Sequence, residues 1–439
     1  MRSLIGLCIV FWAASLSVAQ TREEIVRSDK AKVEADGFWR YNDIPGAFEE
    51  ARRTGKPIVV VLRCLPCHEC VKLDDELVDT DPVIRPLLEQ FVCVRQVATN
   101  GLDLNLFQYD TDQSFAVFFL NADKTIYGRF GTRSHRTEWM GDVSLKGLAK
   151  ALQGALDLHA DYQDVKDSLA GKRGEPMEVA SPELYPTLKD RFTDQLNYEG
   201  DVVKSCIHCH QIGDAQRSYY WDSNRPIPDK VLWPYPHPKL IGLIMDPNDK
   251  ATVKQVTSDS VADQAGVRPG DQIARMDGQP LLSIADIQWV LHNVDPQGGE
   301  IPLQVQRGDQ TLSLTLSFPA DWRQAGDLSW RVTTWGLRRM AAGGLVLESV
   351  EADSGDQASA SDEMRLLVKR VGKYGPHGAA GRAGFKEGDV IIEFDGRSDF
   401  DSEQDLLTYV VQNRQPGDTV DAKVRRGDNV LTLQMPIQQ

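Results

Sequence analysis

The chain has 439 residues, of which 41% are hydrophobic, 26% charged and 8% aromatic, so its composition is that of an ordinary globular protein. At roughly 150 residues per domain, this length predicts about three domains. The net charge is −15 and no basic block is present, which argues against nucleic-acid binding. The seven cysteines are more informative, because five of them lie in two tight clusters.

Residues 1–19 are typical of a secretory signal peptide. Arg2 supplies a positive charge, an apolar run covers residues 4–16, and Ser17-Val18-Ala19 is a small-x-small cleavage site. The run is shorter than the about 20 residues of a transmembrane helix, and an uncleaved anchor remains the alternative. We therefore expect a periplasmic or secreted protein, soluble and away from the membrane once the signal is removed, in a compartment where disulfides persist.

Residues 20–160 alternate strand and helix patterns. The continuous apolar run at 58–62 predicts a strand buried on both faces of a sheet. The order is β-α-β, then a β-hairpin, then a closing helix, an α/β domain. The predicted helices cover 44–54 and 145–158, and the other predicted strands cover 91–97, 115–120 and 126–130.

Residues 161–238 differ in composition from the rest of the chain. Prolines recur with aromatic residues between them, which argues against long regular elements. The segment is therefore predicted to be a linker, or a small irregular module that something else organises.

The remainder contains an internal repeat, with predicted domains at 239–320 and 328–437. The run A-G-x-x-x-G-D-x-I occurs at 265–273 and again at 383–391, and an Asp-Gly pair follows each copy at the same offset. Each copy then shows a helix and a hairpin. The predicted helices are 284–291 and 403–411, and the predicted hairpin turns are 307–309 and 426–428.

These repeats resemble the PDZ domains of bacterial envelope proteases, which are α+β folds built on a partly open β-barrel. The resemblance implies a loop whose backbone N–H groups bind the carboxylate of a protein or peptide terminus. The alternative is that the loops are structural and the domains act as spacers or a dimer surface. No Gly-x-Ser-x-Gly elbow accompanies them, so a serine protease is excluded. The corresponding loop residues are Ile241, Gly242 and Leu243 in the first copy and Trp335, Gly336 and Leu337 in the second.

The first cysteine cluster directly follows the predicted strand 58–62 and precedes a predicted helix. Cys64, Cys67 and Cys70 form two overlapping C-x-x-C motifs. A thiol at a helix N-terminus is acidified, and a second thiol one turn away resolves a mixed disulfide. Residues 20–160 therefore resemble a thioredoxin-like domain, with Cys67 and Cys70 as the preferred redox pair and Cys64 with Cys67 as the other register.

One departure from thioredoxins stands out. Thioredoxins carry a cis-proline opposite the cysteine pair, whereas this chain reads Asp-Gln-Ser-Phe at 112–115. Two alternatives to redox activity therefore stay open: zinc or copper binding by the three cysteines with His68, and an inactive domain. Cys93, in an apolar strand, is expected to be buried and inert.

The second cluster, at 205–210, contains C-x-x-C-H, the attachment signature of c-type haem. Cys206 and Cys209 would bond the porphyrin and His210 would ligate the iron, with Met245 or His237 as the sixth ligand. The competing interpretations are a disulfide, or a zinc site that adds His208.

The arrangement as a whole resembles the bacterial thioredoxin-like/PDZ domain (seleno)proteins, here in a cysteine form. Our first hypothesis from these motifs is an extracytoplasmic thiol–disulfide redox protein, with a redox partner protein, whose PDZ domains bind protein or peptide termini. The alternatives are a non-enzymatic PDZ scaffold, an electron-transfer protein that carries haem c, and a metal-binding chaperone.

Overall fold

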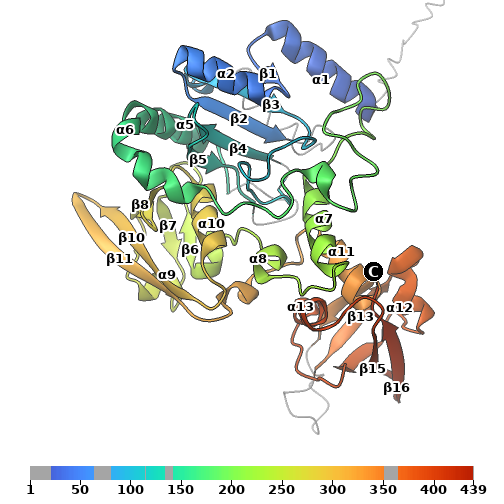
Figure 1. Ribbon diagram of the computed structural model, residues 1–439. Helices are drawn as coiled ribbons and strands as arrows, with labels where there is room; N and C mark the ends of the chain where they lie inside the picture. The colour runs from blue at the N-terminus through green and yellow to red at the C-terminus, as the bar shows by residue number, and fades with distance from the viewer. Residues whose placement is uncertain (1–20, 64–80, 114, 134–141, 351–363, 439) are drawn as a thin grey trace, which may run out of the picture.

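The computed structural model describes residues 21–63, 81–113, 115–133, 142–350 and 364–438. They form an N-terminal domain and two repeat domains, with α7 and α8 between them (Figure 1). Among the described residues, no helix has the length and apolar character needed to cross a membrane.

The N-terminal domain is built on a five-stranded sheet of order β1-β3-β2-β4-β5. Strands β1, β3 and β2 run parallel, and β4 and β5 are antiparallel to their neighbours, so the predicted β-α-β unit and hairpin are confirmed. Its strands are β1 (Arg40–Tyr41), β2 (Ile58–Arg63), β3 (Val92–Gln96), β4 (Phe115–Leu120) and β5 (Ile126–Phe130). Its helices are α1 (Arg22–Asp36), α2 (Ile44–Thr54), α4 (Ile84–Leu88), α5 (Leu145–Ala160) and α6 (Tyr162–Val165).

Alternation along β2 divides the core of this domain between the two faces of the sheet. Val59 and Val61 face α4 and α5, where they pack against residues such as Leu148. Ile58 and Val60 face α2 on the other side. A strand buried on both faces requires the continuous apolar run that the sequence shows.

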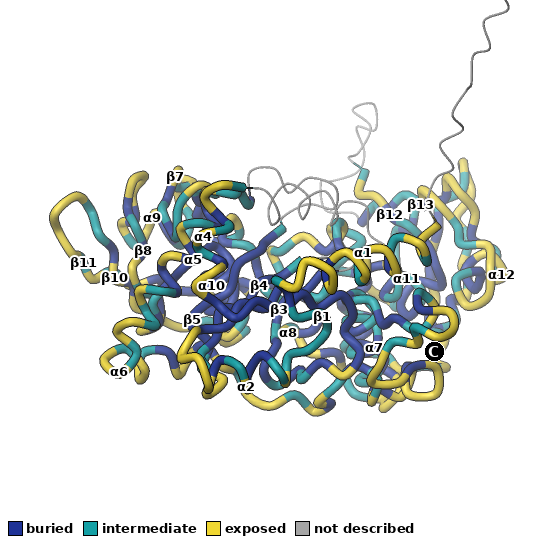
Figure 2. The backbone as a smooth tube through the Cα atoms, turned by 90° about the horizontal axis from the view of Figure 1, so that it is seen from above, coloured by how far each residue is buried: buried dark blue, intermediate teal, exposed yellow. Residues whose placement is uncertain are grey.

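The segment 161–238 covers the α2 face of the same sheet. Its side chains at Val179, Tyr185, Leu188 and Phe192 belong to the core cluster that contains β2. The segment also contains a 13-residue helix, α7 (Cys209–Trp221), so the prediction that it holds no long element is wrong. Packing on the sheet organises this irregular stretch. Figure 2 shows that the strands of the sheet, β3 and β4 among them, are buried in the described structure. Its short elements are η1 (Lys166–Lys172), η2 (Pro182–Leu184), α8 (Asp229–Leu232) and η3 (Pro238–Ile241).

The two repeat domains share one plan, with a sheet and a helix packed across it. Their predicted helices and hairpins are all present, and no sheet closes into a barrel among the described strands. The first contains β6 (Leu243–Met245), β7 (Val253–Val256), α9 (Val261–Gln264), β8 (Gln272–Met276), β9 (Gln279–Pro280), α10 (Ile284–Asn293), β10 (Gly299–Arg307), β11 (Gln310–Phe318) and η4 (Trp322–Ala325). The second contains α11 (Thr334–Ala342), β12 (Leu345–Ser349), β13 (Leu366–Val371), η5 (Gly375–Gly378), α12 (Ala379–Arg382), β14 (Val390–Phe394), α13 (Glu403–Asn413), β15 (Thr419–Arg426) and β16 (Asn429–Pro436).

Candidate functional site

The first cysteine cluster, Cys64, Cys67 and Cys70, lies outside the described residues, but the strand that leads into it is fixed. Arg63, the last residue of β2, is 4% exposed, and its guanidinium donates to Asp29 Oδ1 at 2.8 Å. Arg95 of β3 contacts the same oxygen at 3.3 Å. Helix α1, which the sequence analysis missed, thus supplies the carboxylate that holds the carboxyl ends of two parallel strands.

The second cysteine pair is packed against this end of the sheet. Cys209 is the first residue of α7, and it is buried with Leu62 and Phe118 in the core of the N-terminal domain. Its Sγ accepts a hydrogen bond from the Tyr109 hydroxyl at 3.1 Å. Cys209 is therefore held in place both by core packing and by this hydrogen bond.

Backbone contacts fix the position of this pair. Asn100 Oδ1 accepts from the backbone N–H of Ile207 at 2.8 Å, and the Thr99 hydroxyl donates to the carbonyl of Ile207 at 2.8 Å. Buried polar groups that are satisfied in this way hold one conformation. The loop that carries the second C-x-x-C is therefore part of the N-terminal domain.

The carboxyl end of β2 and the second cysteine pair line one hollow in the described structure. Arg63, Thr99, His208 and Cys209 are among the residues that line it. Cys64 follows Arg63 directly, so the chain enters the first cluster from the wall that Cys209 shares. Their separation in the sequence hid this proximity.

Cys206 and Cys93 have the environment of unreactive thiols. Burial, with the neighbouring Cys209, raises the pKa of the Cys206 thiol to about 12. Burial likewise raises the pKa of Cys93 far above its ordinary value, and its Sγ lies 3.3 Å from the Leu88 carbonyl oxygen. A buried thiol that stays protonated is a poor nucleophile.

The described residues at the C-x-x-C-H motif do not fit a haem. Covalent attachment requires both sulfurs to face one open macrocycle site, whereas Cys206 and Cys209 are 7% and 6% exposed. The hollow beside Cys209 is too narrow for a water molecule. The His210 ring lies parallel to that of His208, with centroids 5.8 Å apart. No group of three or more histidine, cysteine or acidic side chains is placed for metal binding in the described chain, so the zinc set with His208 is not assembled there.

In the loop before β4, where thioredoxins carry their proline, two buried aspartates bind an arginine from another part of the chain. Asp110 and Asp112 are buried there, and Arg331, from the connection between the two repeat domains, donates to both. The distances from Arg331 Nη1 are 2.8 Å to Asp110 Oδ1 and 3.1 Å to Asp112 Oδ2. Asp112 Oδ1 also accepts from the backbone N–H of Thr333 at 3.1 Å. This loop thus anchors the second repeat domain, a role with no signal in the sequence.

The loop of the first repeat at Ile241, Gly242 and Leu243 is a tight turn. Gly242 has φ +84°, and a Cβ there would lie 2.0 Å from Ser260 Oγ, so only glycine fits. Ile241 and Leu243 are buried on either side of it, and Leu243 begins β6.

Helix α10 of this first repeat is docked on the N-terminal domain. Asp286 and Lys172 form an ion pair at 2.9 Å, and both side chains are fully buried. The Ser283 hydroxyl donates to the Arg129 carbonyl at 2.6 Å. The whole stretch from Ile284 to Leu291 is buried. The first repeat is therefore held rigidly against the sheet.

In the second repeat the structure corrects the position of the corresponding loop. Trp335, Gly336 and Leu337 lie within helix α11, not in a turn before a strand. The turn that precedes β12 contains Gly343 and Gly344, with φ +57° and +88°. Trp-Gly-Leu matches the apolar-Gly-apolar pattern of such loops, but these residues form part of helix α11.

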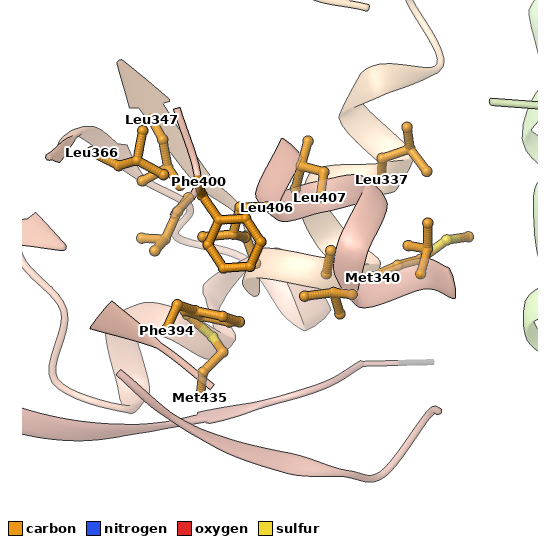
Figure 3. Packing of buried hydrophobic residues seen from close by; sticks show 14 of the residues in the cluster. Leu337, Met340, Leu347, Leu366, Phe394, Phe400, Leu406, Leu407 and Met435 are labelled. Carbon is orange, nitrogen blue, oxygen red and sulfur yellow. The ribbon is translucent and has the colours of Figure 1, made fainter. Parts of the chain in front are cut away.

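Helix α11 covers the groove of the second repeat. Figure 3 shows Leu337 and Met340 of α11 beside Leu406 and Leu407 of α13, all in one core cluster. This arrangement fills the space between β12 and α13 with the chain's own helix.

The edge of β12 is also capped by a side chain. Glu403 of α13 accepts from the backbone N–H of Leu347 at 2.8 Å, and it is held by Arg338 of α11 at 2.6 Å. A peptide that adds to β12 as a strand needs such an outward N–H group.

Comparisons with known proteins identify the domains. A thioredoxin-like family model matches residues 39–122, and a PDZ domain model matches residues 240–318 and 350–437. A probable periplasmic serine endoprotease DegP-like from Halomonas elongata is 26% identical over 151 residues, which are 34% of this chain and 29% of that protein. The chain thus spans less than a third of this relative's length.

Two solved structures show only a weak overall likeness. The HtrA-type protease AlgW with decapeptide has 16% identity and a TM-score of 0.20, and the match covers 31% of this chain and 41% of AlgW. An AlgW variant with decapeptide has 15% identity and a TM-score of 0.21, with 43% and 54% covered. Scores this low carry no argument about fold or function.

Proposed function

We propose that this chain, which combines a thioredoxin-like domain with two PDZ domains, is an extracytoplasmic thiol–disulfide redox protein that recruits protein partners. The observation that carries the proposal is the shared hollow at the carboxyl end of β2, lined by Arg63 on one side and Cys209 on the other. Residues 1–19 support the compartment, because their pattern is that of a secretory signal.

The proposed reaction is a two-electron exchange. The Cys67 thiolate attacks one sulfur of a partner disulfide, which forms a mixed disulfide and releases the other partner sulfur as a thiolate. The Cys70 thiolate then attacks Cys67, which releases the second partner sulfur and leaves a Cys67–Cys70 disulfide. The partner is reduced to a dithiol, the chain's dithiol is oxidised, and the reverse sequence oxidises a dithiol partner.

Thiol exchange of the full mature chain with a disulfide-containing protein tests this proposal. We expect Cys67→Ser to abolish exchange and Cys70→Ser to accumulate a mixed disulfide, because the resolving thiol is lost. Cys93→Ala is the matched control, since burial keeps that thiol protonated and it should leave the rate unchanged. Exchange at the wild-type rate in Cys67→Ser would refute the proposed role of Cys67.

The first PDZ domain is proposed to bind peptide C-termini at the Gly242 loop and the edge of β6. The support is the PDZ family match together with the positive φ of Gly242. Fluorescence anisotropy with a labelled decapeptide, its C-terminus free or amidated, measures this binding. Gly242→Ala should weaken it, because the new methyl group collides with Ser260 Oγ.

The control for this measurement is Gly266→Ala. Gly266 also has a positive φ, of +79°, but no atom lies within 4 Å of the position a Cβ would take. The two variants therefore impose similar backbone strain and differ in the collision. Equal affinity for the free and amidated peptides would argue against carboxylate recognition.

A non-enzymatic scaffold is the second candidate, and one observation favours it. The loop before β4, where thioredoxins carry their proline, is occupied by the contacts of Asp110 and Asp112 with Arg331. A chain that binds peptides but shows no thiol exchange would have this function.

A further inference from the structure

A cavity of about 350 Å³ lies where the N-terminal domain, α7 and α10 meet. This size is at the lower end of the roughly 300–1,000 Å³ range of small-molecule sites. Such sites occur preferentially where domains meet, and this one draws its walls from three parts of the chain.

The walls are mainly apolar and aromatic. The N-terminal domain contributes Phe107 and Tyr109, and α7 contributes Ile212 and Tyr220. The segment before the first PDZ domain also contributes Tyr235. Burial of an organic ligand against these surfaces would supply the nonspecific part of its binding energy.

A buried cation with unused hydrogen-bonding capacity also lines the cavity. Arg217 is 2% exposed, its Nη2 donates to the Leu232 carbonyl at 3.3 Å, and its Nη1 has no hydrogen-bond partner. It lies on α7, one turn after Asp214, yet makes no ion pair within 4 Å among the described residues. Burying a guanidinium N–H group without a hydrogen-bond acceptor is costly, so Arg217 Nη1 needs an acceptor.

Two of the three acidic residues that line the cavity are already engaged, and the third, Glu175, is exposed to solvent. Asp112 is held by Arg331 and Thr333, and Glu178 by Arg225. Lys230, at the cavity, makes only a long contact of 3.4 Å to an amide oxygen of Asn293.

We propose that this cavity binds a small organic carboxylate with an apolar body. One carboxylate oxygen accepts from Arg217 Nη1, Lys230 adds a second cation, and the apolar body lies against the tyrosines. A carboxylate fits better than a phosphate, because Arg217 offers one unused donor and Asp112 opposes a doubly charged group.

Titration calorimetry of the full mature chain with sodium 4-phenylbutyrate tests this site, with 4-phenylbutyramide and inorganic phosphate as the comparison probes. We expect saturable 1:1 binding of the carboxylate and no binding of the amide. Arg217→Met should weaken binding about tenfold or more, because a charge-assisted hydrogen bond is lost. Lys230→Gln should weaken it several-fold, and Lys254→Gln, an exposed lysine on β7, should leave it unchanged.

One further variant keeps the test decisive if Arg217→Met fails to fold. Gln216→Trp, on the same wall of the cavity, fills the space and should abolish binding while every charge remains. The proposal is overturned if the carboxylate gives no saturable binding, if the amide or phosphate binds equally well, or if Gln216→Trp and Lys230→Gln both bind as the wild type does.

Discussion

Replacing Arg331 with methionine should detach the second PDZ domain from the thioredoxin-like domain. In the native protein its guanidinium lies 2.8 Å from Asp110 and 3.1 Å from Asp112, and its Nη2 donates to the Pro234 carbonyl at 2.6 Å. All three charged side chains are at most 5% exposed. Removing one partner of a buried ion pair leaves an uncompensated charge. We therefore expect the free energy of unfolding to fall by about 3–5 kcal/mol.

The loss should depend on pH in a defined direction. Burial raises the pKa of Asp110, with Arg331 offsetting part of the increase. Burial also acts to raise the pKa of Asp112. The charges of Arg331 and Arg217 and the hydrogen bonds from Thr333 outweigh this effect, so the pKa of Asp112 lies below its ordinary value. Asp112 therefore stabilises the native protein above its ordinary pKa, and this contribution disappears as the pH falls through the lower native value.

Without Arg331 the pKa values of both carboxyl groups rise, because an opposite charge that favoured their ionised forms is gone. Protonated carboxyl groups need no cation, so the difference between variant and wild type should be large at pH 7.5 and smaller at pH 5. Urea unfolding at the two pH values, with scattering measurements of the radius of gyration, reports both the energy and the detachment.

Two outcomes would contradict this reasoning. One is a loss below about 1 kcal/mol, the size of an exposed pair. The other is a loss that stays constant or grows toward pH 5. The triple variant Arg331→Met with Asp110→Asn and Asp112→Asn is the control, and it should recover much of the stability because neither carboxylate is left buried without the Arg331 cation.

Three further predictions concern Lys172, Glu403 and the second cysteine pair. Lys172→Met should destabilise docking of the first PDZ domain by about 3–5 kcal/mol, because Asp286 remains buried without its cation, and adding Asp286→Asn should restore most of the loss in urea unfolding. Glu403→Gln should increase peptide binding by the second PDZ domain in anisotropy titrations, because the carboxylate that caps the N–H of Leu347 loses its charge and its hold on α11; unchanged binding would show that the groove is closed by α11 alone. Protein made in a host with haem-attachment machinery should show no Soret band after acid-acetone extraction, since the second cysteine pair is buried, and a retained band would contradict this arrangement.

The regular elements were predictable because local patterns determine them. A few neighbouring residues are enough to predict each of these elements. Examples are the apolar run of β2, the buried face of α2 at Ala47, Phe48 and Ala51, and the paired glycine turns of the repeats. The duplicated Asp-Gly hairpins led directly to the two PDZ domains, which the family match confirms.

The site could be predicted only in part, because its contacts join distant segments. Tyr109 contacts Cys209 across 100 positions and Arg331 contacts Asp110 across 221, and neither pair leaves a periodic pattern. The loop at Trp335 illustrates a different limit, since a three-residue motif is too short to outweigh the helical pattern around it.

The segment 161–238 has a consequence for how the protein must be produced and must fold. Val179, Phe192 and Ile212 complete the apolar interior beneath the sheet, so a fragment that ends at residue 160 would present that face to water and aggregate. During synthesis the first domain cannot finish folding until α7, which ends at Trp221, has emerged, long after β5 ends at Phe130 and α6 at Val165. Any expression boundary for the isolated domain therefore belongs after Trp221.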